Sequence, residues 1–262
     1  FKSLPLEEHG LKWIHSPVQL AHPFEDGSAA ILTSSIEETA SYLDEDEKKY
    51  IKLMKPLVKD WPEIEKDLLG PFRFPSHPIK ALRFGFYALR SAEYLSETVF
   101  TGSKAKALVA GLAAHSFSPL HHPITASFAL VLAIYGHISG WPFPEGGAQN
   151  ITNALAAYFK SLNGKLETGI EVKSLKDIPS ANVILFDLTP AQLIKIAGTK
   201  LPNFYKKRLK KYRYGPGAFK VDFALSEPVP FKNQNCNSAC TIHLGGLYKN
   251  ISESEESIWK GK

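Results

Sequence analysis

The chain has 262 residues, of which 44% are hydrophobic and 22% are charged, and its formal net charge is +5. This composition excludes an intrinsically disordered chain and allows a sizeable core. The charge is mild for the length, so it does not by itself indicate nucleic-acid binding. The two cysteines, Cys236 and Cys240, have no second pair, which argues against a zinc site or a disulfide framework and for a reducing compartment such as the cytoplasm.

The first 140 residues are expected to form short strands and then helices. The strand patterns are Leu11–Ser16, Val18–Phe24 and Ala29–Ser34. Helical periodicity then predicts Ile36–Leu43, Asp46–Leu69, Pro78–Phe100, Ser103–Ser116 and Ile124–Ser139. Ser35 and Glu38 have the spacing of a capping box, whereas Pro56 and Pro62 are expected to kink or split the second helix.

After Gly140 the pattern changes to strand, turn and helix in βαβ-like order. The segments are a helix over Ala148–Leu162, a strand over Lys165–Leu175, a strand over Ala181–Pro190 and a helix over Ala191–Gly198. The run Ala181–Pro190 is continuously apolar, which is typical of a strand buried on both faces. The rest of the chain predicts a basic helix around Lys206–Arg213, strands over Ala218–Ser226 and Cys240–Gly246, and a last helix from Ser252. The predicted fold class is mixed α+β and α/β, with a helix-rich region and a mixed β-sheet.

No self-contained cofactor motif is present. The stretch GWPFPEGGAQNITNALAAYF carries Gly140, Gly146 and Gly147, but this spacing does not match G-x-G-x-x-G, and an apolar helix precedes it in place of a strand. A sharp turn is therefore favoured over a phosphate site. The chain also has no G-x-x-x-x-G-K-[ST] and no G-x-S-x-G nucleophile motif, so the catalytic residues stay unknown.

Two further clusters are explained more simply than by a functional site. His115, His121 and His122 lie close in sequence, but they lack the spacing and the carboxylate partner of a metal site, so a capping or polar-lining role is favoured over metal binding. The basic run Lys206–Arg213 is interleaved with tyrosines, as in some single-strand binders. A solvated helix face is favoured there over nucleic-acid binding.

Several longer segments occur in a characteristic order: GWPFPEGGAQNITNALAAYFKSLNGKLETGIEVKSL, ANVILFDLTPAQLIKIAG, YRYGPGAFKVDFAL and HLGG. In this order they resemble the phytoene desaturase-like FAD-dependent oxidoreductases of the flavin amine oxidase superfamily. The resemblance extends over essentially the whole chain. It implies a substrate-binding region at residues 1–140, a partial FAD-binding segment at 141–200, and a return to the substrate-domain sheet and helix at 201–262.

The resemblance also implies where a cofactor would lie. By position in the family's pattern, the backbone at Val172 would face the adenine of FAD, and the end of the next strand, with Thr189 and Pro190, would lie near the flavin. The family's G-x-G-x-x-G and its closing flavin-site segment are not found, so we expect a central part of a longer enzyme that is inactive alone and does not retain FAD by itself.

Two hypotheses of different classes follow. The first is a FAD-dependent oxidoreductase that dehydrogenates an apolar small-molecule substrate, with no nucleic-acid partner and with peripheral membrane contact left open. The second is a non-catalytic module that binds an apolar ligand or a partner protein through the helices of Pro78–Ser139.

Overall fold

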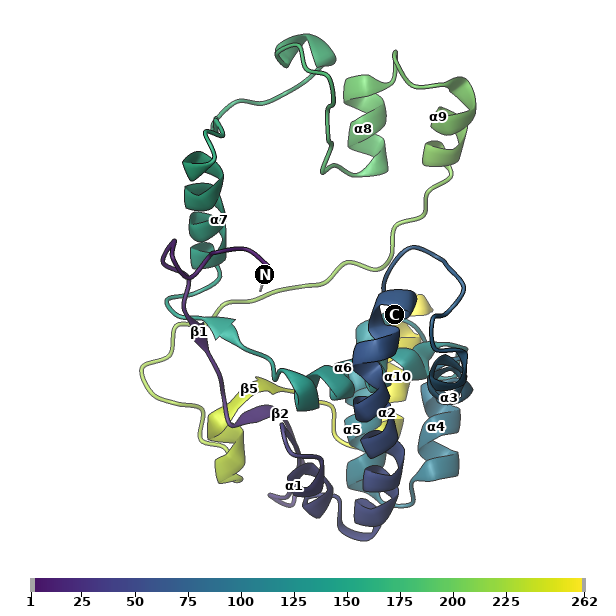
Figure 1. The fold of residues 1–262 in the computed structure, drawn as a ribbon. Coiled ribbons are helices and arrows are strands. Elements are labelled where there is room, and N and C mark those ends of the chain that lie inside the picture. The colour runs from purple at the N-terminus through teal and green to yellow at the C-terminus, as the bar shows by residue number, and fades with distance from the viewer. Residues whose placement is uncertain (1–2, 261–262) are drawn as a thin grey trace. The chain divides into compact units, whose positions relative to one another are not determined.

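The computed structural model describes residues 3–260. They form two compact units, each described by itself: the sheet unit, residues 10–152 and 218–260, and the α7–α9 unit, residues 3–9 and 153–217. The fold is mixed α+β, rich in helix and with a small mixed sheet (Figure 1). The boundaries expected near residues 140 and 200, between the substrate-binding and FAD-binding regions, stay a prediction.

The sheet unit contains a three-stranded sheet in the order β3-β2-β5. Strand β2 (Val18–Pro23) pairs antiparallel with β3 (Ala29–Thr33) and parallel with β5 (Ala239–Ile242). β3 is buried throughout and β2 nearly so, as expected of strands that are apolar on both faces. A separate short pair joins β1 (Trp13–Ile14) to β4 (Phe143–Pro144).

Helices cover the sheet and supply most of the core of this unit. The helical segments described there are α1 (Ile36–Ser41), η1 (Asp44–Asp46), α2 (Glu47–Leu68), α3 (Pro78–Ala88), α4 (Ala92–Val99), α5 (Ser103–Ala113), η2 (Ala114–Ser116), α6 (Thr125–Ile138), η4 (Gln234–Ser238) and α10 (Tyr248–Trp259). The predicted capping box of α1 is confirmed in part: the Ser35 side chain accepts a hydrogen bond from the Glu38 N–H at 3.1 Å, whereas the Ser35 N–H donates to Thr33 Oγ1 in place of the Glu38 side chain.

Helix α2 runs without interruption through Pro56 and Pro62, so the predicted split is wrong. A proline inside a helix costs about 3 kcal/mol or more, because it lacks an N–H and its ring crowds the preceding turn. One face of α2 is buried along most of its length, with the Trp61 ring 5.3 Å from that of Phe84 and Leu57 in the same core. That burial offsets the cost of the prolines.

The segment Pro78–Phe100 forms two helices, α3 and α4, so the prediction of one continuous helix is wrong. The Ser91 hydroxyl accepts a hydrogen bond from the Tyr94 N–H at 3.0 Å, which begins a new helix. A serine side chain at this position satisfies a backbone donor that has no partner within the helix. The local capping preference therefore outweighs the continuous helical periodicity.

Asp46 connects the start of α2 to the start of α5. Its fully buried carboxylate accepts hydrogen bonds from the backbone N–H of Thr101 at 3.0 Å and of Gly102 at 2.6 Å, and from the Lys49 ammonium at 2.8 Å. Burial alone would raise the pKa of Asp46, but these bonds together hold it below the usual range of a carboxyl. The loop between α4 and α5 is fixed by this one side chain.

The α7–α9 unit has little internal pairing. It contains most of α7 (Gln149–Ser161), η3 (Leu175–Asp177), α8 (Pro190–Ala197) and α9 (Asn203–Lys210). The His9 ring lies 5.4 Å from that of Tyr158 and so joins the beginning of the described chain to α7. The predicted helices here are confirmed in type, although α9 is shorter than the basic pattern.

Three predicted strands do not form: Lys165–Leu175, Ala181–Pro190 and Ala218–Ser226 have no strand pairing. Within Ala181–Pro190, Val183 is 73% exposed and Leu185 is 91% exposed, which overturns the expectation of a strand buried on both faces. A strand exists only when another strand takes up its N–H and C=O groups, and the described residues provide none beside these segments.

Within residues 3–260, no helix is both long enough and apolar enough to cross a membrane. The apolar helix α6 has 14 residues, fewer than the roughly 20 that a span requires.

Candidate functional site

Val172 lies in irregular backbone of the α7–α9 unit, and its side chain is half-buried. The next two N–H groups, of Lys173 and Ser174, both donate to the Asp177 carboxylate at 2.9 Å. The N–H and C=O of Val172 itself make no hydrogen bond to any residue in the described range. The backbone at Val172 is therefore available to pair with a ligand or another strand.

Thr189 and Pro190 begin α8. The Thr189 hydroxyl accepts from the Gln192 N–H, and the Thr189 N–H donates to Gln192 Oε1 at 3.0 Å, which completes a capping box. Pro190 has no N–H, and the Ala191 N–H faces the Tyr214 hydroxyl at 3.4 Å. The first donors of α8 are thus occupied, so this helix end orients the chain and offers no open cradle for a phosphate. Roles of Val172, Thr189 and Pro190 in holding a cofactor stay a prediction.

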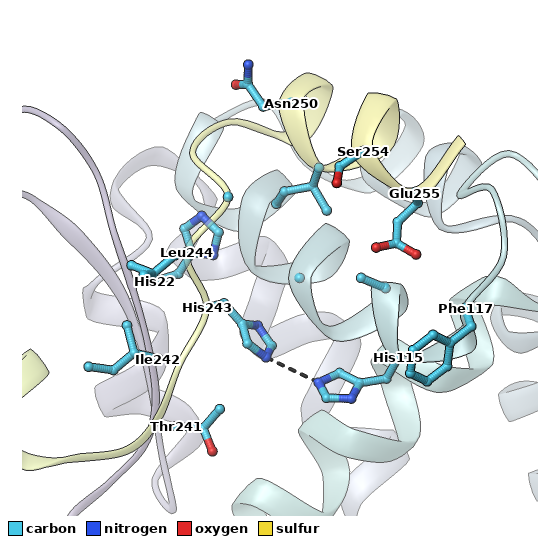
Figure 2. Close-up of a pocket in the computed structure, with 14 residues that line it drawn as sticks. His22, His115, Phe117, Thr241, Ile242, His243, Leu244, Asn250, Ser254 and Glu255 are labelled. Atoms are coloured by element: carbon cyan, nitrogen blue, oxygen red, sulfur yellow. Dashed lines mark hydrogen bonds between the residues drawn. The ribbon is translucent and has the colours of Figure 1, made fainter. Parts of the chain in front are cut away.

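The sheet unit contains a pocket of about 390 Å³, shown in Figure 2. Its wall is formed by β2, by β5 with the segment that follows it, and by the helical segments α5, η2 and α10. The lining residues are His22, Gly111, Ala114, His115, Phe117, Thr241, Ile242, His243, Leu244, Gly245, Asn250, Ile251, Ser254 and Glu255. Most of the lining surface is apolar, and the polar side chains include three histidines and one glutamate.

The parallel pairing of β2 with β5 brings two of the histidines into the same wall. His22 is near the end of β2, and the chain after β5 continues the pairing, because the His243 N–H donates to the Ala21 carbonyl at 3.0 Å. Gly111 on α5 provides the space for the His243 ring, since a Cβ there would lie 2.6 Å from His243 Nδ1 and 3.5 Å from His22 Nδ1. A residue with a side chain at position 111 would displace His243.

The hydrogen bonds determine the proton position on His22. Its Nε2 lies 2.7 Å from the Gly246 carbonyl oxygen, which can only accept, so Nε2 carries the proton and Nδ1 of the neutral ring is an acceptor. Nε2 of His243 faces Nε2 of His115 at 3.2 Å, so one ring donates and the other accepts. The Nδ1 atoms of His22 and His243 are buried and have no partner within the described chain.

Burial controls the ionisation of this pocket. It lowers the pKa of His243 to about 4, to which His115 and His22 add by charge repulsion, and it also lowers the pKa of His22 and His115. Burial raises the pKa of Glu255, whose Oε2 is buried without a partner among the described residues. The imidazoles are therefore neutral near pH 7, and the pocket disfavours charge of either sign.

Helix α10 closes one side of the pocket and is held at both ends. The Asn250 side chain accepts from the Leu247 N–H at 3.1 Å, and the Trp259 indole N–H donates to the Phe117 carbonyl at 2.9 Å. Figure 2 shows Ser254 and Glu255 projecting from this helix toward the facing histidines. The two contacts fix the position of the carboxyl group relative to α5 and η2.

The sequence pointed to only part of this pocket. Of the histidines it singled out, His115 lines the pocket, whereas His121 and His122 are exposed and contact each other edge to face, with ring centroids 4.7 Å apart. His22 and His243 were missed. The signal was a single titratable residue inside each of two apolar strand-like runs, LAHPF and TIHLGG.

The remaining candidates from the sequence are a metal cluster and the basic helix. Across residues 3–260, no group of three or more His, Cys, Asp or Glu side chains could hold a metal ion. In the α7–α9 unit, α9 exposes most of its basic side chains, among them Lys207 and Lys210, as a solvated helix face does. Nucleic-acid binding by this face stays untested.

Comparison with models of known protein families gives no match for this chain, and comparison with curated proteins gives none either.

Proposed function

We propose that this chain is the substrate-binding and central part of a FAD-dependent oxidoreductase similar to phytoene dehydrogenase, which dehydrogenates an apolar substrate by hydride transfer to the flavin. The order of family-like segments supports this function. The structural observation that carries it is the segment Ala181–Leu188, which is apolar and unpaired and leads directly into the capped helix α8. Cytoplasmic location is part of the same proposal.

A strand that is apolar on both faces is normally found inside a parallel sheet covered by helices. The segment Ala181–Leu188 has this composition, and Thr189 and Pro190 begin a helix directly after it, as in a βα unit. Its N–H and C=O groups and its exposed Val183 and Leu185 would all be satisfied by strands on either side and helices on both faces. A helix-covered parallel sheet supplies both, and a nucleotide-binding sheet is one sheet of this kind.

The chain's own residues fit FAD in part. The unpaired backbone of Val172 could hydrogen-bond the adenine, as the resemblance implies. Thr189 and Pro190 instead orient α8, because their polar groups are used in its cap. When bound, FAD would supply the hydride acceptor, and the protein would supply position, an apolar surface and exclusion of water. No residue of this chain is assigned a catalytic role.

A binding module is the second candidate, favoured by the exposed face of α3. Four large apolar side chains of α3 and its C-cap follow helical spacing and are all more than half exposed: Ile79, Leu82, Phe86 and Leu89. The preceding loop extends this apolar surface with two exposed aromatic rings, those of Phe72 and Phe74. Such a surface suits a partner protein or a membrane, and a membrane contact is compatible with either candidate.

Flavin content separates the two candidates. The complete natural polypeptide containing this chain should copurify with FAD, and its visible flavin absorbance should bleach when an isoprenoid substrate is added without oxygen. A parallel sample of this chain alone should be colourless. A complete polypeptide that contains no flavin and does not bind added FAD would reject the oxidoreductase proposal and favour the binding module.

A further inference from the structure

We propose that one surface of the sheet unit lies on an anionic lipid bilayer, with its apolar side chains inserted among the lipid head groups. The proposal concerns the sheet unit alone and requires no flavin, so it goes beyond the proposed oxidoreductase function. The surface, called the α3 face, consists of six exposed apolar side chains of α3, its C-cap and the loop before it: Phe72, Phe74, Ile79, Leu82, Phe86 and Leu89.

The α3 face is a second apolar side of a helix that already packs on the core. Phe84 and Ala88 are buried in the core of the sheet unit. The exposed apolar residues from Ile79 onward follow one another at steps of three and four, which places them in one stripe on the opposite side of α3. In the preceding loop, which stands clear of the helices of this unit in Figure 1, Phe72 is fully exposed and Phe74 is 85% exposed. Exposed apolar surface of this kind marks a contact with a partner or a membrane.

The charged side chains around the α3 face present positive charge to solvent. Residues 68–92 contain no Asp or Glu, and they contain four basic residues: Arg73, Lys80, Arg83 and Arg90. Arg73 pairs with Asp67 of α2, whose side chain is 2% exposed against 51% for the arginine. Arg83 pairs with Asp60 of α2 in the same way, at 6% against 46%. In both pairs the group that a ligand would meet is therefore the guanidinium.

Arg90 is positioned to bind a lipid phosphate. Its guanidinium carbon lies 4.4 Å from the centroid of the Phe86 ring and 4.2 Å from that of Tyr94, so the two rings hold it beside the α3 face. Among the described residues Arg90 has no ion-pair partner, whereas Lys80 is balanced by the partly exposed Glu63. A planar guanidinium can donate two parallel hydrogen bonds to a phosphate group.

A bilayer fits this combination better than a second copy of the chain does. Helices that lie on a bilayer bury their apolar side chains about 5–10 Å deep, at the boundary between head groups and acyl chains, and place Lys and Arg at the phosphates. A two-fold dimer joins identical surfaces, so the basic side chains of one copy would lie among those of the other. Like charges repel, so the charge of the α3 face favours an anionic lipid surface.

Vesicle cosedimentation of the complete natural polypeptide containing this chain tests the proposal. We expect vesicles of phosphatidylcholine with about 30% phosphatidylserine to bind it at least about tenfold more tightly than vesicles of phosphatidylcholine alone, because each basic residue near an anionic surface adds to binding. No binding to the anionic vesicles, or equal binding to both kinds, would overturn the proposal. Flavin absorbance of the same sample reports on the oxidoreductase proposal separately.

Paired substitutions of the two loop rings locate the contact. Phe72→Ser combined with Phe74→Ser should weaken binding to the anionic vesicles at least about tenfold, because two inserted rings are lost. The matched control, Phe72→Trp combined with Phe74→Trp, keeps aromatic rings suited to a membrane interface and should bind within about threefold of the wild type. Unchanged binding of the serine variant, or an equal loss in both variants, would contradict the proposed contact.

Two further measurements separate the charge effect and the alternative occupant. Arg90→Gln should weaken binding to the anionic vesicles by about fivefold and leave binding to phosphatidylcholine vesicles unchanged. An unchanged preference for anionic vesicles in that variant would refute the role of Arg90. Size-exclusion chromatography shows whether the face joins two copies: a dimer that the serine variant abolishes, in a protein that does not bind vesicles, would overturn the proposal in favour of a second copy.

Discussion

The two units of this chain each contain a largely apolar segment, but one segment is buried and the other is exposed. In the sheet unit, β3 (Ala29–Thr33) is apolar and every residue in it is buried. In the α7–α9 unit, Ala181–Leu188 is apolar apart from Asn182 and Asp187, yet Val183 and Leu185 are largely exposed and no strand in the described residues pairs with the segment. The difference lies in the neighbours that each segment has.

This contrast shows that an apolar strand pattern leads to a buried strand only where other segments pair with it and cover it. β2 and β3 are joined by a short turn, so the entropy cost of bringing them together is small. The segment Ala181–Leu188 has no strand before or after it that pairs with it within residues 3–260. The proposed flavin-binding sheet would provide strands to pair with this segment.

The largest expected effect is on the core of the sheet unit. Trp61→Ala should lower the free energy of unfolding by about 3–5 kcal/mol, because the buried ring packs against Phe84 and Tyr135. Leu185→Ala should change it by less than about 0.5 kcal/mol, because that side chain is exposed. Urea unfolding followed by circular dichroism measures both. A Leu185→Ala effect as large as that of Trp61→Ala would refute the contrast between the units.

A second prediction concerns the Asp46 contact in the same unit. Asp46→Ala should destabilise the fold by roughly 3 kcal/mol, because the N–H groups of Thr101 and Gly102 and the Lys49 ammonium lose their buried acceptor. Asp177→Ala, the matched change in the α7–α9 unit, removes an exposed carboxylate that also accepts two N–H bonds, and should cost less than about 1 kcal/mol. Urea unfolding measures the loss of unfolding free energy in both variants. Similar losses for Asp46→Ala and Asp177→Ala would show that burial of the Asp46 carboxylate does not cause the larger effect expected there.

Acid should destabilise the sheet unit well above the pH at which carboxylates titrate. His137 is buried and hydrogen-bonded to the Tyr50 hydroxyl at 2.8 Å, and burial lowers its pKa from 6.5 to about 4. Because the unfolded state then binds a proton that the folded state does not, His137 should account for about 3 kcal/mol of the stability lost between pH 6.5 and 4, and the buried histidines of the pocket should add to that loss. His137→Gln keeps an acceptor for Tyr50 without titrating, so it should make this part of the profile less steep. An unchanged profile in that variant would contradict the assignment.

The smallest expected effects come from the glycines. Gly85→Ala should stabilise the sheet unit by about 0.4–1 kcal/mol, because α3 keeps its geometry and the unfolded chain loses freedom. Gly136→Ala should destabilise it by about 1–3 kcal/mol, since the added Cβ would lie 2.8 Å from Leu32 Cδ2 in the core. Thermal unfolding of the two variants compares them directly. A rise in stability for both would show that the helix–sheet packing tolerates the extra carbon.

The parts of the fold that the sequence predicts well are local. The N-cap at Ser35 was recognisable because a cap depends on residues three positions apart. The unbroken α2 was not, because packing around Trp61 outweighs the local cost of Pro56 and Pro62. Whether a helix continues through a proline depends on how its side chains are buried in the fold, and the spacing of residues along the sequence does not show this burial.

The candidate pocket was predicted only in part for the same reason. His22 and His243 are separated by most of the chain and meet because β5 pairs in parallel with β2. Only a prediction of strand pairing could have brought them together, and long-range pairing is the least accessible feature of a single sequence. Their isolated positions within apolar runs were the one local sign, since a buried titratable side chain needs a reason to be there.

Amide hydrogen exchange of residues 181–188 in the complete polypeptide, with and without FAD, tests the central claim most directly. Unpaired amides exchange quickly, whereas amides inside a sheet are protected up to the stability of the unit. We predict that FAD-loaded protein protects this segment, together with the backbone around Val172, and that this chain alone leaves both unprotected. Fast exchange of residues 181–188 in protein saturated with FAD would contradict the assignment of this segment to a flavin-binding sheet.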